Sequence, residues 1–417
     1  MKKRIINAID EHKNDIIACG EYILNNPELG FKEFKTSAYV KEEFSKLGIP
    51  FKDNLAVTGV MGVVGNPNAK INICIIGEMD AIKCYGHPHA DAVTGAAHAC
   101  GHNAQVAQMI GAAYGIVKSG MMEECDCKIT FLAVPAEEFV ELDYRERLVN
   151  NGAITYMSGK QELIHLGIFE DIDIAIMIHA HALTPKPFLH MCGSSLGFDV
   201  KQFTFLGKSA HGSEPWNGIN ALDAAVMAIN GINANRAVFK ESDRVRIHSI
   251  ISNGGDLVNV IPDKAVIDTY VRAANNEALK DAAIKVDNAA KAGALSVGAT
   301  CSIKNVKGYA PLKQDENLSN VFEDNALMFL DANSIDHYKD MTGSTDMGDV
   351  SNLIPAIQPT IGGFDGALHS KEFTIVDKEF VYITASKILA CTVYDLIKDD
   401  AKTATAIKES FAKKLNS

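Results

Sequence analysis

The chain contains the short apolar run Ile71-Asn72-Ile73-Cys74-Ile75-Ile76, which is rich in isoleucine. A short run of β-branched residues predicts a buried β-strand. Two further runs, 129–134 and 173–178, have the same character, and apolar residues recur at helical spacing from Ala104 onward. Strands that alternate with helices pair in parallel. The sequence therefore predicts an α/β fold with a mostly parallel sheet flanked by helices.

Polar side chains of the kinds that bind metals follow each of these three predicted strands. Asp80 follows the first strand, Glu137 and Glu138 follow the second, and His179 follows the third. In open α/β sheets, functional sites form at the carboxyl ends of the strands. We therefore expect these four residues to lie near one another.

A second domain is expected between residues 193 and 308. Its predicted elements follow the order βαββαβ, which is typical of a ferredoxin-like α+β unit. This domain would be inserted into the first one, which would comprise residues 1–192 and 309–417. The expected strands are 198–206, 244–252, 264–272 and 300–306, and the expected helices are 218–233 and 276–297.

The length of the chain indicates the number of domains, and its net charge limits the possible partners. A chain of 417 residues exceeds the usual size of one core, which supports two domains. There are 40 Lys and Arg residues against 52 Asp and Glu residues, giving a net charge of −12. Nucleic acid is therefore not an expected partner, because phosphate binding requires a basic face.

The sequence also favours a cytoplasmic protein without a membrane segment. The basic residues at the N-terminus are followed by Asp10 and Glu11 before any apolar run develops, unlike a signal peptide. No uninterrupted apolar stretch approaches the roughly 18 residues of a membrane span. The nine cysteines are scattered without the spacing of a disulfide framework, which fits a reducing compartment.

The segment Ala97-His98-Ala99-Cys100-Gly101-His102-Asn103 is the strongest chemical signal in the chain. On an extended loop, Cys100 and His102 can point to one side and bind one metal ion. A thiolate with an imidazole suits zinc or a neighbouring transition metal better than magnesium or calcium. Taken alone, the segment is equally compatible with a buried structural cysteine beside a hydrogen-bonded histidine.

The other candidates are weak when each is considered separately. Adjacent carboxylates such as Glu137 and Glu138 are usually solvated charges, but beside a metal one can bind it while the other acts as a general base. His179 and His181 alternate along an expected strand, so both could face the site. His369 is weaker still by itself.

Two other motifs do not fit their context. Gly193-Ser194-Ser195-Leu196-Gly197 matches a nucleophile elbow, which would make Ser195 a nucleophile, but a strand follows where that motif requires a helix. Gly207-Lys208-Ser209 ends like a phosphate-binding loop, but Gln202 replaces the first glycine. A serine hydrolase is therefore a distant alternative.

Several motifs together resemble the dimetal amidohydrolase branch of the aminoacylase and carboxypeptidase metallopeptidase superfamily. Relatives in that branch include indole-acetyl-amino-acid hydrolases and aminobenzoyl-glutamate hydrolases. The similarity covers nearly the whole chain, in order, and so many ordered matches are specific. The motifs are 26–37, Gly77-Glu78-Met79-Asp80-Ala81-Ile82, 98–102, 135–138, Ser209-Ala210-His211-Gly212, 259–263 and Ala367-Leu368-His369.

The resemblance implies a site with two divalent metal ions, zinc or manganese, with cobalt or nickel as alternatives. It also implies that the first domain is catalytic and that the inserted domain is a lid and dimerisation domain of a homodimer. Asp80 would orient a metal ligand, Glu137 would be the general base, and His211 would reach the substrate carbonyl, in the partner subunit's site. The implied metal ligands are Cys100, His102, Glu138, His179 and His369, and the implied substrate-binding residues are Asn259 and Arg272.

By the same resemblance, we expect a metal-dependent hydrolase that cleaves the amide bond of N-acyl or N-aroyl amino acids or of short peptides. Asn103 and the segment 343–348 resemble the aminobenzoyl-glutamate hydrolase subgroup, and Glu78 stands where many members of the superfamily have a histidine. A dipeptidase or aminopeptidase of the same superfamily is the alternative. A metal-binding protein without catalysis is a more distant one.

Overall fold

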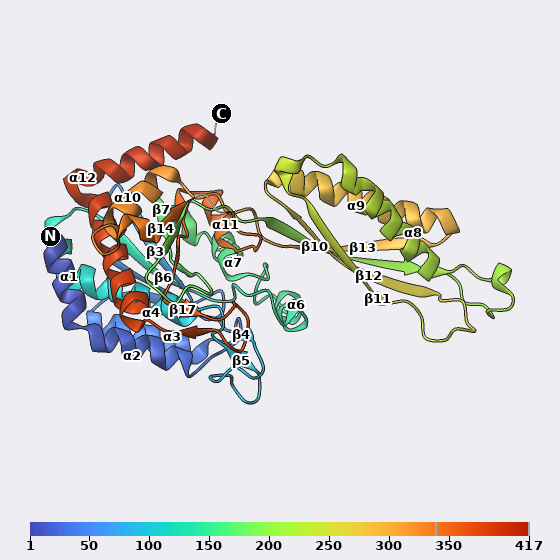
Figure 1. The fold of residues 1–417 in the computed structure, drawn as a ribbon, viewed down its shortest axis with the longest axis horizontal. Coiled ribbons are helices and arrows are strands. Elements are labelled where there is room, and N and C mark those ends of the chain that lie inside the picture. The colour runs from blue at the N-terminus through green and yellow to red at the C-terminus, as the bar shows by residue number, and fades with distance from the viewer. Residues whose placement is uncertain (338–339, 416–417) are drawn as a thin grey trace. The chain divides into compact units, whose positions relative to one another are not determined.

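The computed structural model describes residues 1–337 and 340–415, and the chain in it divides into two compact units (Figure 1). The first unit comprises residues 1–193, 313–340 and 349–417. The second comprises residues 194–312 and 341–348. The second unit is thus inserted into the chain of the first.

The first unit is built on a six-stranded sheet with the order β1-β2-β6-β3-β7-β15. The four strands from β6 to β15 run parallel, whereas β1 and β2 are antiparallel to their neighbours. All seven residues of β3 are buried, which is typical of a parallel strand covered on both faces. The mostly parallel sheet is therefore confirmed. Its strands are β1 (Phe51–Leu55), β2 (Gly59–Gly65), β3 (Asn72–Glu78), β6 (Lys128–Val134), β7 (Ile174–Ile176) and β15 (Ala356–Ile357).

Helices pack on this sheet, and the most buried of them is α4 (His102–Lys118). Every residue of α4 from His102 to Ile116 is buried, and the helix contacts β3, α1, α2 and α12. The helical spacing seen from Ala104 in the sequence thus marks a central helix rather than an amphipathic one. The longer helices around it are α1 (Lys2–Glu11), α2 (Lys13–Leu24), α3 (Phe34–Leu47), α10 (Glu316–Ala326) and α12 (Ala385–Leu415).

The helical segment Glu379–Lys414 is long and apolar enough to cross a membrane by length and composition alone. However, 83% of its apolar window is buried inside the protein. The segment is therefore a core helix of the first unit, packed against α1, α4 and α10. Its regular geometry is interrupted at Lys398–Ala401, where Asp399 and its two successors adopt left-handed backbone angles.

Short elements that the sequence analysis does not anticipate complete the first unit. A second sheet has the order β14-β9-β16-β8, and two small ladders pair β4 with β5 and β17 with β18. The added strands are β4 (Ile82–Lys83), β5 (Ala96–Ala97), β8 (His179–Ala180), β9 (Leu189–Met191), β14 (Ile335–His337), β16 (Thr360–Ile361), β17 (Phe364–Asp365) and β18 (Thr374–Ile375). The short helices are α5 (Met121–Glu124), α6 (Leu142–Asn150), α7 (Gly159–His165) and α11 (Met347–Ser351).

The second unit is a four-stranded antiparallel sheet with the order β11-β12-β10-β13. Its helices α8 and α9 pack against each other and against the sheet (Figure 1), and Phe203, Phe205 and Ile267 lie in the core between them. The chain order βαββαβ is the one expected for a ferredoxin-like unit. Its elements are β10 (Gly197–Leu206), α8 (Ala221–Ala234), β11 (Arg246–Asn253), β12 (Lys264–Ala273), α9 (Asn276–Val297) and β13 (Thr300–Lys307).

Segment 341–348 differs from the expected division, because it packs with the second unit rather than with the first. Two backbone hydrogen bonds hold it there: Met341 N donates to Ser194 O at 2.8 Å, and Leu196 N donates to Gly343 O at 3.1 Å. Residues 309–312 also belong to the second unit. Pairing between distant backbone segments of this kind leaves no local sequence pattern.

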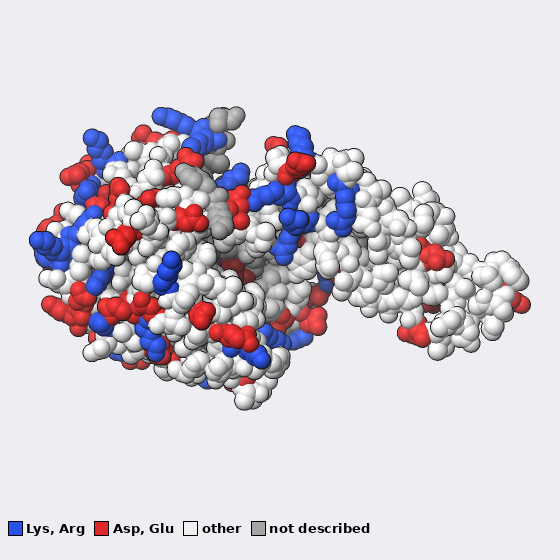
Figure 2. All heavy atoms as spheres, viewed as in Figure 1, with Lys and Arg blue, Asp and Glu red and all other residues white. Residues whose placement is uncertain are grey.

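Charges of both signs are interspersed on the face of the protein shown in Figure 2. On the first unit, Lys and Arg side chains alternate with Asp and Glu, and no continuous basic surface covers this face. A nucleic-acid-binding face would show clustered Lys and Arg residues. This view therefore agrees with the acidic net charge of the chain.

Candidate metal centre

The ends of three neighbouring parallel strands supply most of the candidate ligands. Asp80 follows β3, Glu137 and Glu138 follow β6, and His179 opens β8 shortly after β7. Since β3 pairs in parallel with both β6 and β7, these ends meet at one edge of the sheet. The structure thus brings the four residues together, as their positions after the strands predict.

Cys100 and His102 reach the same place from the turn before α4. Between them, Gly101 has a φ of +84°, a left-handed angle that glycine adopts without steric cost. A Cβ atom at position 101 would lie 2.9 Å from Cβ of Ala180, next to His179. The turn therefore needs a glycine for its backbone angle and for its close approach to β8.

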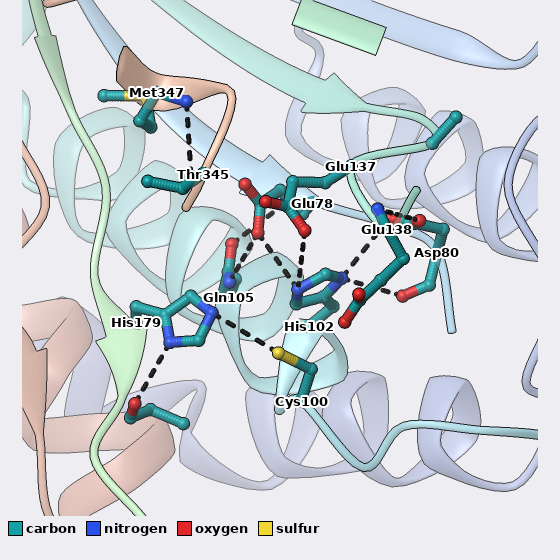
Figure 3. Close-up of polar contacts among 12 residues, drawn as sticks. Glu78, Asp80, Cys100, His102, Gln105, Glu137, Glu138, His179, Thr345 and Met347 are labelled. Carbon is teal, nitrogen blue, oxygen red and sulfur yellow. Dashed lines mark hydrogen bonds and ion pairs between the residues drawn. The ribbon is translucent and has the colours of Figure 1, made fainter. Parts of the chain in front are cut away.

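Cys100 lies at the centre of two groups of possible ligands. Its Sγ atom is 3.5 Å from Nε2 of His179 and 3.4 Å from Nε2 of His369, whose Nε2 is also 3.1 Å from Oε1 of Glu138. The donor atoms of Cys100, His102 and His179 lie within 4.8 Å of one another, and so do those of Cys100, Glu138 and His369. Figure 3 shows His179 and His102 on either side of the thiol.

His102 is oriented by Asp80. Its Nδ1 lies 2.8 Å from the backbone oxygen of Asp80, and because a carbonyl only accepts, Nδ1 carries a proton. Its Nε2 is buried, 3.1 Å from Oε2 of Glu78 and 4.0 Å from Oε2 of Glu137, and makes no hydrogen bond. Although burial opposes the charge, Glu78 raises the pKa of His102 well above its usual value, so the metal-free ring is protonated and faces two carboxylates (Figure 3). A cation placed there would satisfy all three groups.

The surroundings of Cys100 determine when its thiol ionises. Burial raises the pKa of the Cys100 thiol well above its usual value, and the Glu138 carboxylate raises it further. Thiols in such surroundings ionise when a metal ion binds them. Oε1 of Glu138 is also buried, 3.1 Å from Nε2 of His369. These donors, one thiolate, three imidazoles and one carboxylate, fit zinc or a similar divalent metal.

Glu78 lies in a fully buried ion pair beside this site. Its carboxylate contacts Nζ of Lys160 and accepts a hydrogen bond from Nε2 of Gln105 at 2.9 Å. Although burial opposes the charge, Lys160 and His102 lower the pKa of Glu78 to about 2. Neither Lys160 nor Gln105 is predicted from the sequence, because a helical lysine or glutamine is ordinarily an exposed residue.

The neighbouring histidines lie apart from the two ligand groups. His181 contacts Oγ1 of Thr184 at 2.9 Å and packs on Phe188. His98 is 1% exposed, and burial, together with the charges of His102 and His87, lowers its pKa to about 3. His98 is therefore a neutral buried side chain next to the candidate ligands.

The remaining predicted residues lie in the second unit. His211 and Asn259 are exposed on adjacent segments, since His211 pairs with Val260 and Gly212 N donates to Asn259 O at 2.7 Å. Arg272 is half-buried between two aromatic rings of this unit, and its Nη1 donates to Oγ of Ser344 at 2.6 Å.

Comparisons with known proteins agree with this geometry. Residues 194–297 match the model of the peptidase dimerisation domain of M20 proteins. The human Xaa-Arg dipeptidase is 31% identical over 341 residues, which are 78% of this chain and 72% of that protein. The chain belongs to the M20 metallopeptidase family. It is therefore a hydrolase of amide or peptide bonds, as the resemblance implies.

Other M20 relatives support the same assignment. An IAA-amino acid hydrolase of Arabidopsis thaliana, ILR1-like 5, is 29% identical over 263 residues, covering 60% of this chain and 54% of the relative. A dinuclear metal-binding peptidase of the M20 family from Bacillus subtilis has the same fold, with a TM-score of 0.71 at 20% identity over 93% of this chain and 99% of that one. The predicted superfamily, fold and enzyme class are thus confirmed.

Proposed function

We propose that this M20 protein hydrolyses the amide bond of N-acyl or N-aroyl amino acids, or of short peptides, with two divalent metal ions. The observation that carries the proposal is the position of Cys100. Its Sγ atom is shared by two groups of three possible ligands, which have no other member in common. One thiolate shared between two such groups can bind two ions side by side, as two-metal hydrolysis requires.

In this proposal, Cys100, His102 and His179 hold one ion, and Cys100, Glu138 and His369 hold the other. Zinc or manganese is the proposed metal, with cobalt or nickel as alternatives, because thiolate and imidazole bind all of these. Asp80 keeps the ring of His102 in place through its backbone oxygen. Such supporting contacts commonly fix the orientation of a ligating histidine.

Bound ions would supply Lewis acidity to the substrate carbonyl and to the attacking water. The protein would supply the proton transfers, with Glu137 taking a proton from the water and passing it to the leaving nitrogen. Glu137 is 7% exposed and lies beside His102, so it can reach a water there. His211 would stabilise the oxyanion from the partner subunit, and Asn259 and Arg272 would bind the substrate, with Arg272 suited to a carboxylate.

Replacing Glu137 with Gln tests the assignment of the general base. The amide keeps the shape of the carboxylate but cannot accept the proton, so we expect metal content to be unchanged and turnover to be lost, by at least about 100-fold. Metal analysis of the purified protein and a hydrolysis screen with added Zn²⁺ or Mn²⁺ would measure both. Activity of Glu137→Gln close to that of the original protein would refute this role.

A dipeptidase is the second candidate, and the human Xaa-Arg dipeptidase among the relatives favours it. The two candidates differ in whether the substrate carries a free amino group. Assays of one dipeptide with its N-terminus free and acylated would separate them. Faster hydrolysis of the free form would identify a dipeptidase, and faster hydrolysis of the acylated form would identify an acyl-amino-acid hydrolase.

A further inference from the structure

The loop after β6, which carries Glu137 and Glu138, is held through its backbone by buried polar side chains. Ala136 has a φ of +54°, a left-handed angle that is unfavourable for a residue with a Cβ atom. Its N–H donates to Oε1 of Glu33 at 2.8 Å, and the N–H of Glu138 donates to Oδ2 of Asp80 at 2.9 Å. The backbone N–H groups of the residues before and after Glu137 are therefore held by buried carboxyl groups.

The carbonyl groups of the same loop are held by Arg145, which lies in α6. Its Nη1 donates to Ala136 O at 3.2 Å and also to Met157 O, and its Nη2 donates to Glu138 O. Arg145 is fully buried, and within residues 1–337 and 340–415 no carboxylate forms an ion pair with it. Burying a guanidinium without a counterion costs folding free energy, and its hydrogen bonds to the loop carbonyl groups offset part of that cost.

Two aromatic rings and a glycine surround the guanidinium group of Arg145. The rings of Phe31 and Phe139 have their centroids 5.4 and 5.9 Å from Cζ of Arg145. At Gly30, a Cβ atom would lie 2.5 Å from Nη2 of Arg145 and 2.9 Å from Cα of Ala136. Because Gly30 has no side chain, the N-terminal segment leaves room for Arg145 to reach the loop.

We propose that Arg145 is a positioning residue that clamps the carbonyl groups of the residues before and after Glu137, Ala136 and Glu138, and so aims the Glu137 carboxylate at the reacting water. The proposal rests on the function proposed above, in which Glu137 is the general base. The fork of a guanidinium can hold two carbonyl oxygens at fixed separation, whereas an ammonium group cannot. Figure 3 shows Glu137 and Glu138 on this loop, with Glu137 directed towards His102.

Arg145→Met tests the clamp, and Arg147→Met, an exposed arginine on the same helix, is the matched control. Because a displacement of about 1 Å in a catalytic group can cost about 100-fold in rate, we expect kcat to fall by about that factor in Arg145→Met. KM should change little, since no substrate-binding group is altered, and kcat is compared with the metal sites saturated because Arg145 also holds the carbonyl group of Glu138, a proposed ligand. Arg147→Met should behave like the original protein.

Rescue experiments separate positioning from general stability. In Arg145→Ala, added guanidinium ion at non-denaturing concentration should restore kcat in a saturable manner, and it should have no such effect on Arg147→Ala. If Arg145→Ala does not fold, Arg145→Lys provides the test, because it keeps the charge but loses the fork and should show an intermediate kcat. A folded, metal-loaded Arg145 variant with the original kcat would overturn the proposal.

Hydrogen exchange tests the clamp without depending on catalysis. The amides of Ala136 and Glu138 should exchange about tenfold faster in Arg145→Met than in Arg147→Met, because local opening becomes easier. If the original protein hydrolyses no amide in the screen, the proposed function fails while this measurement still decides the clamp. Equal exchange in the two variants would contradict it, even if Glu137→Gln confirms the general base.

Discussion

Glu33 is a buried carboxyl group whose ionisation opposes folding. Burial, reinforced by the charge of Asp80, raises its pKa from 4.5 to about 8, although hydrogen bonds from Thr58 and Ala136 act in the other direction. Between these two pH values, the folded protein binds more protons than the unfolded chain. Stability is therefore full below about pH 4.5 with respect to this group and is lost as the pH rises through about 8.

Glu33→Gln should flatten this dependence, because the amide keeps an acceptor for Ala136 N and carries no charge. We expect the original metal-free protein to lose at most about 1.4 kcal/mol per pH unit across this window from Glu33, and the variant to lose less. Urea unfolding at several pH values between 5 and 9 measures the difference, with the exposed Glu11→Gln as control. Parallel pH profiles for Glu33→Gln and the original protein would contradict the prediction.

The sequence indicates the ligand candidates better than the residues that support them. Cys100, His102 and His369 are of types that rarely occur together by chance, and their motifs identify them. Glu33, Arg145 and Lys160, by contrast, are common residue types in ordinary helical or loop sequences. Glu33 and Lys160 lie 103 and 82 positions from the groups they hold, and Arg145 lies 7 to 12 positions away. Only the folded chain shows that they are buried.

At the scale of elements, the turn between β5 and α4 sets the spacing of Cys100 and His102. Gly101→Ala would strain a left-handed backbone and press on Ala180, whereas Gly48→Ala would strain a similar angle, φ +69°, with no atom within 4 Å. Both variants should lose about 1–2 kcal/mol of stability. Only Gly101→Ala should also weaken metal binding, by about tenfold, because Cys100 and His102 shift relative to His179.

Competition with a chelator measures the metal affinity, and urea unfolding measures the stability of both variants. Gly48 ends α3 at the surface of the first unit, so its variant reports the backbone cost alone. If Gly101→Ala binds metal as tightly as Gly48→Ala, the turn does not control the spacing of the ligands.

The long elements of the fold are predictable, and the short ones are not. β3, β6 and β10 begin and end within two residues of their predicted bounds, because each is a continuous run of strand-forming residues. The sheet of β8, β9, β14 and β16 consists of strands of two or three residues. Their pairing is decided by contacts between distant parts of the chain, which local patterns do not encode.

At the scale of the whole molecule, the dimerisation domain indicates a homodimer. The sheet of the second unit has two edges, β11 and β13. On β11, the side chains of Ile250 and Ile251 are 54% and 40% exposed, whereas β13 carries Lys304 and Lys307. Because exposed apolar edges favour pairing and lysines oppose it, we expect β11 to form the contact with a second copy.

If His211 acts in the partner subunit's site, mixing two inactive variants should restore part of the activity. Glu137→Gln and His211→Ala homodimers should each be inactive, but a mixed dimer would contain one site with both residues intact. After equal amounts are dissociated and allowed to reassociate, half of the dimers are mixed, so about a quarter of the original activity should return. The same mixture with Ile250→Lys added to both chains should remain monomeric by light scattering and inactive. Recovery without dimers, or dimers without recovery, would show that His211 does not act across the interface.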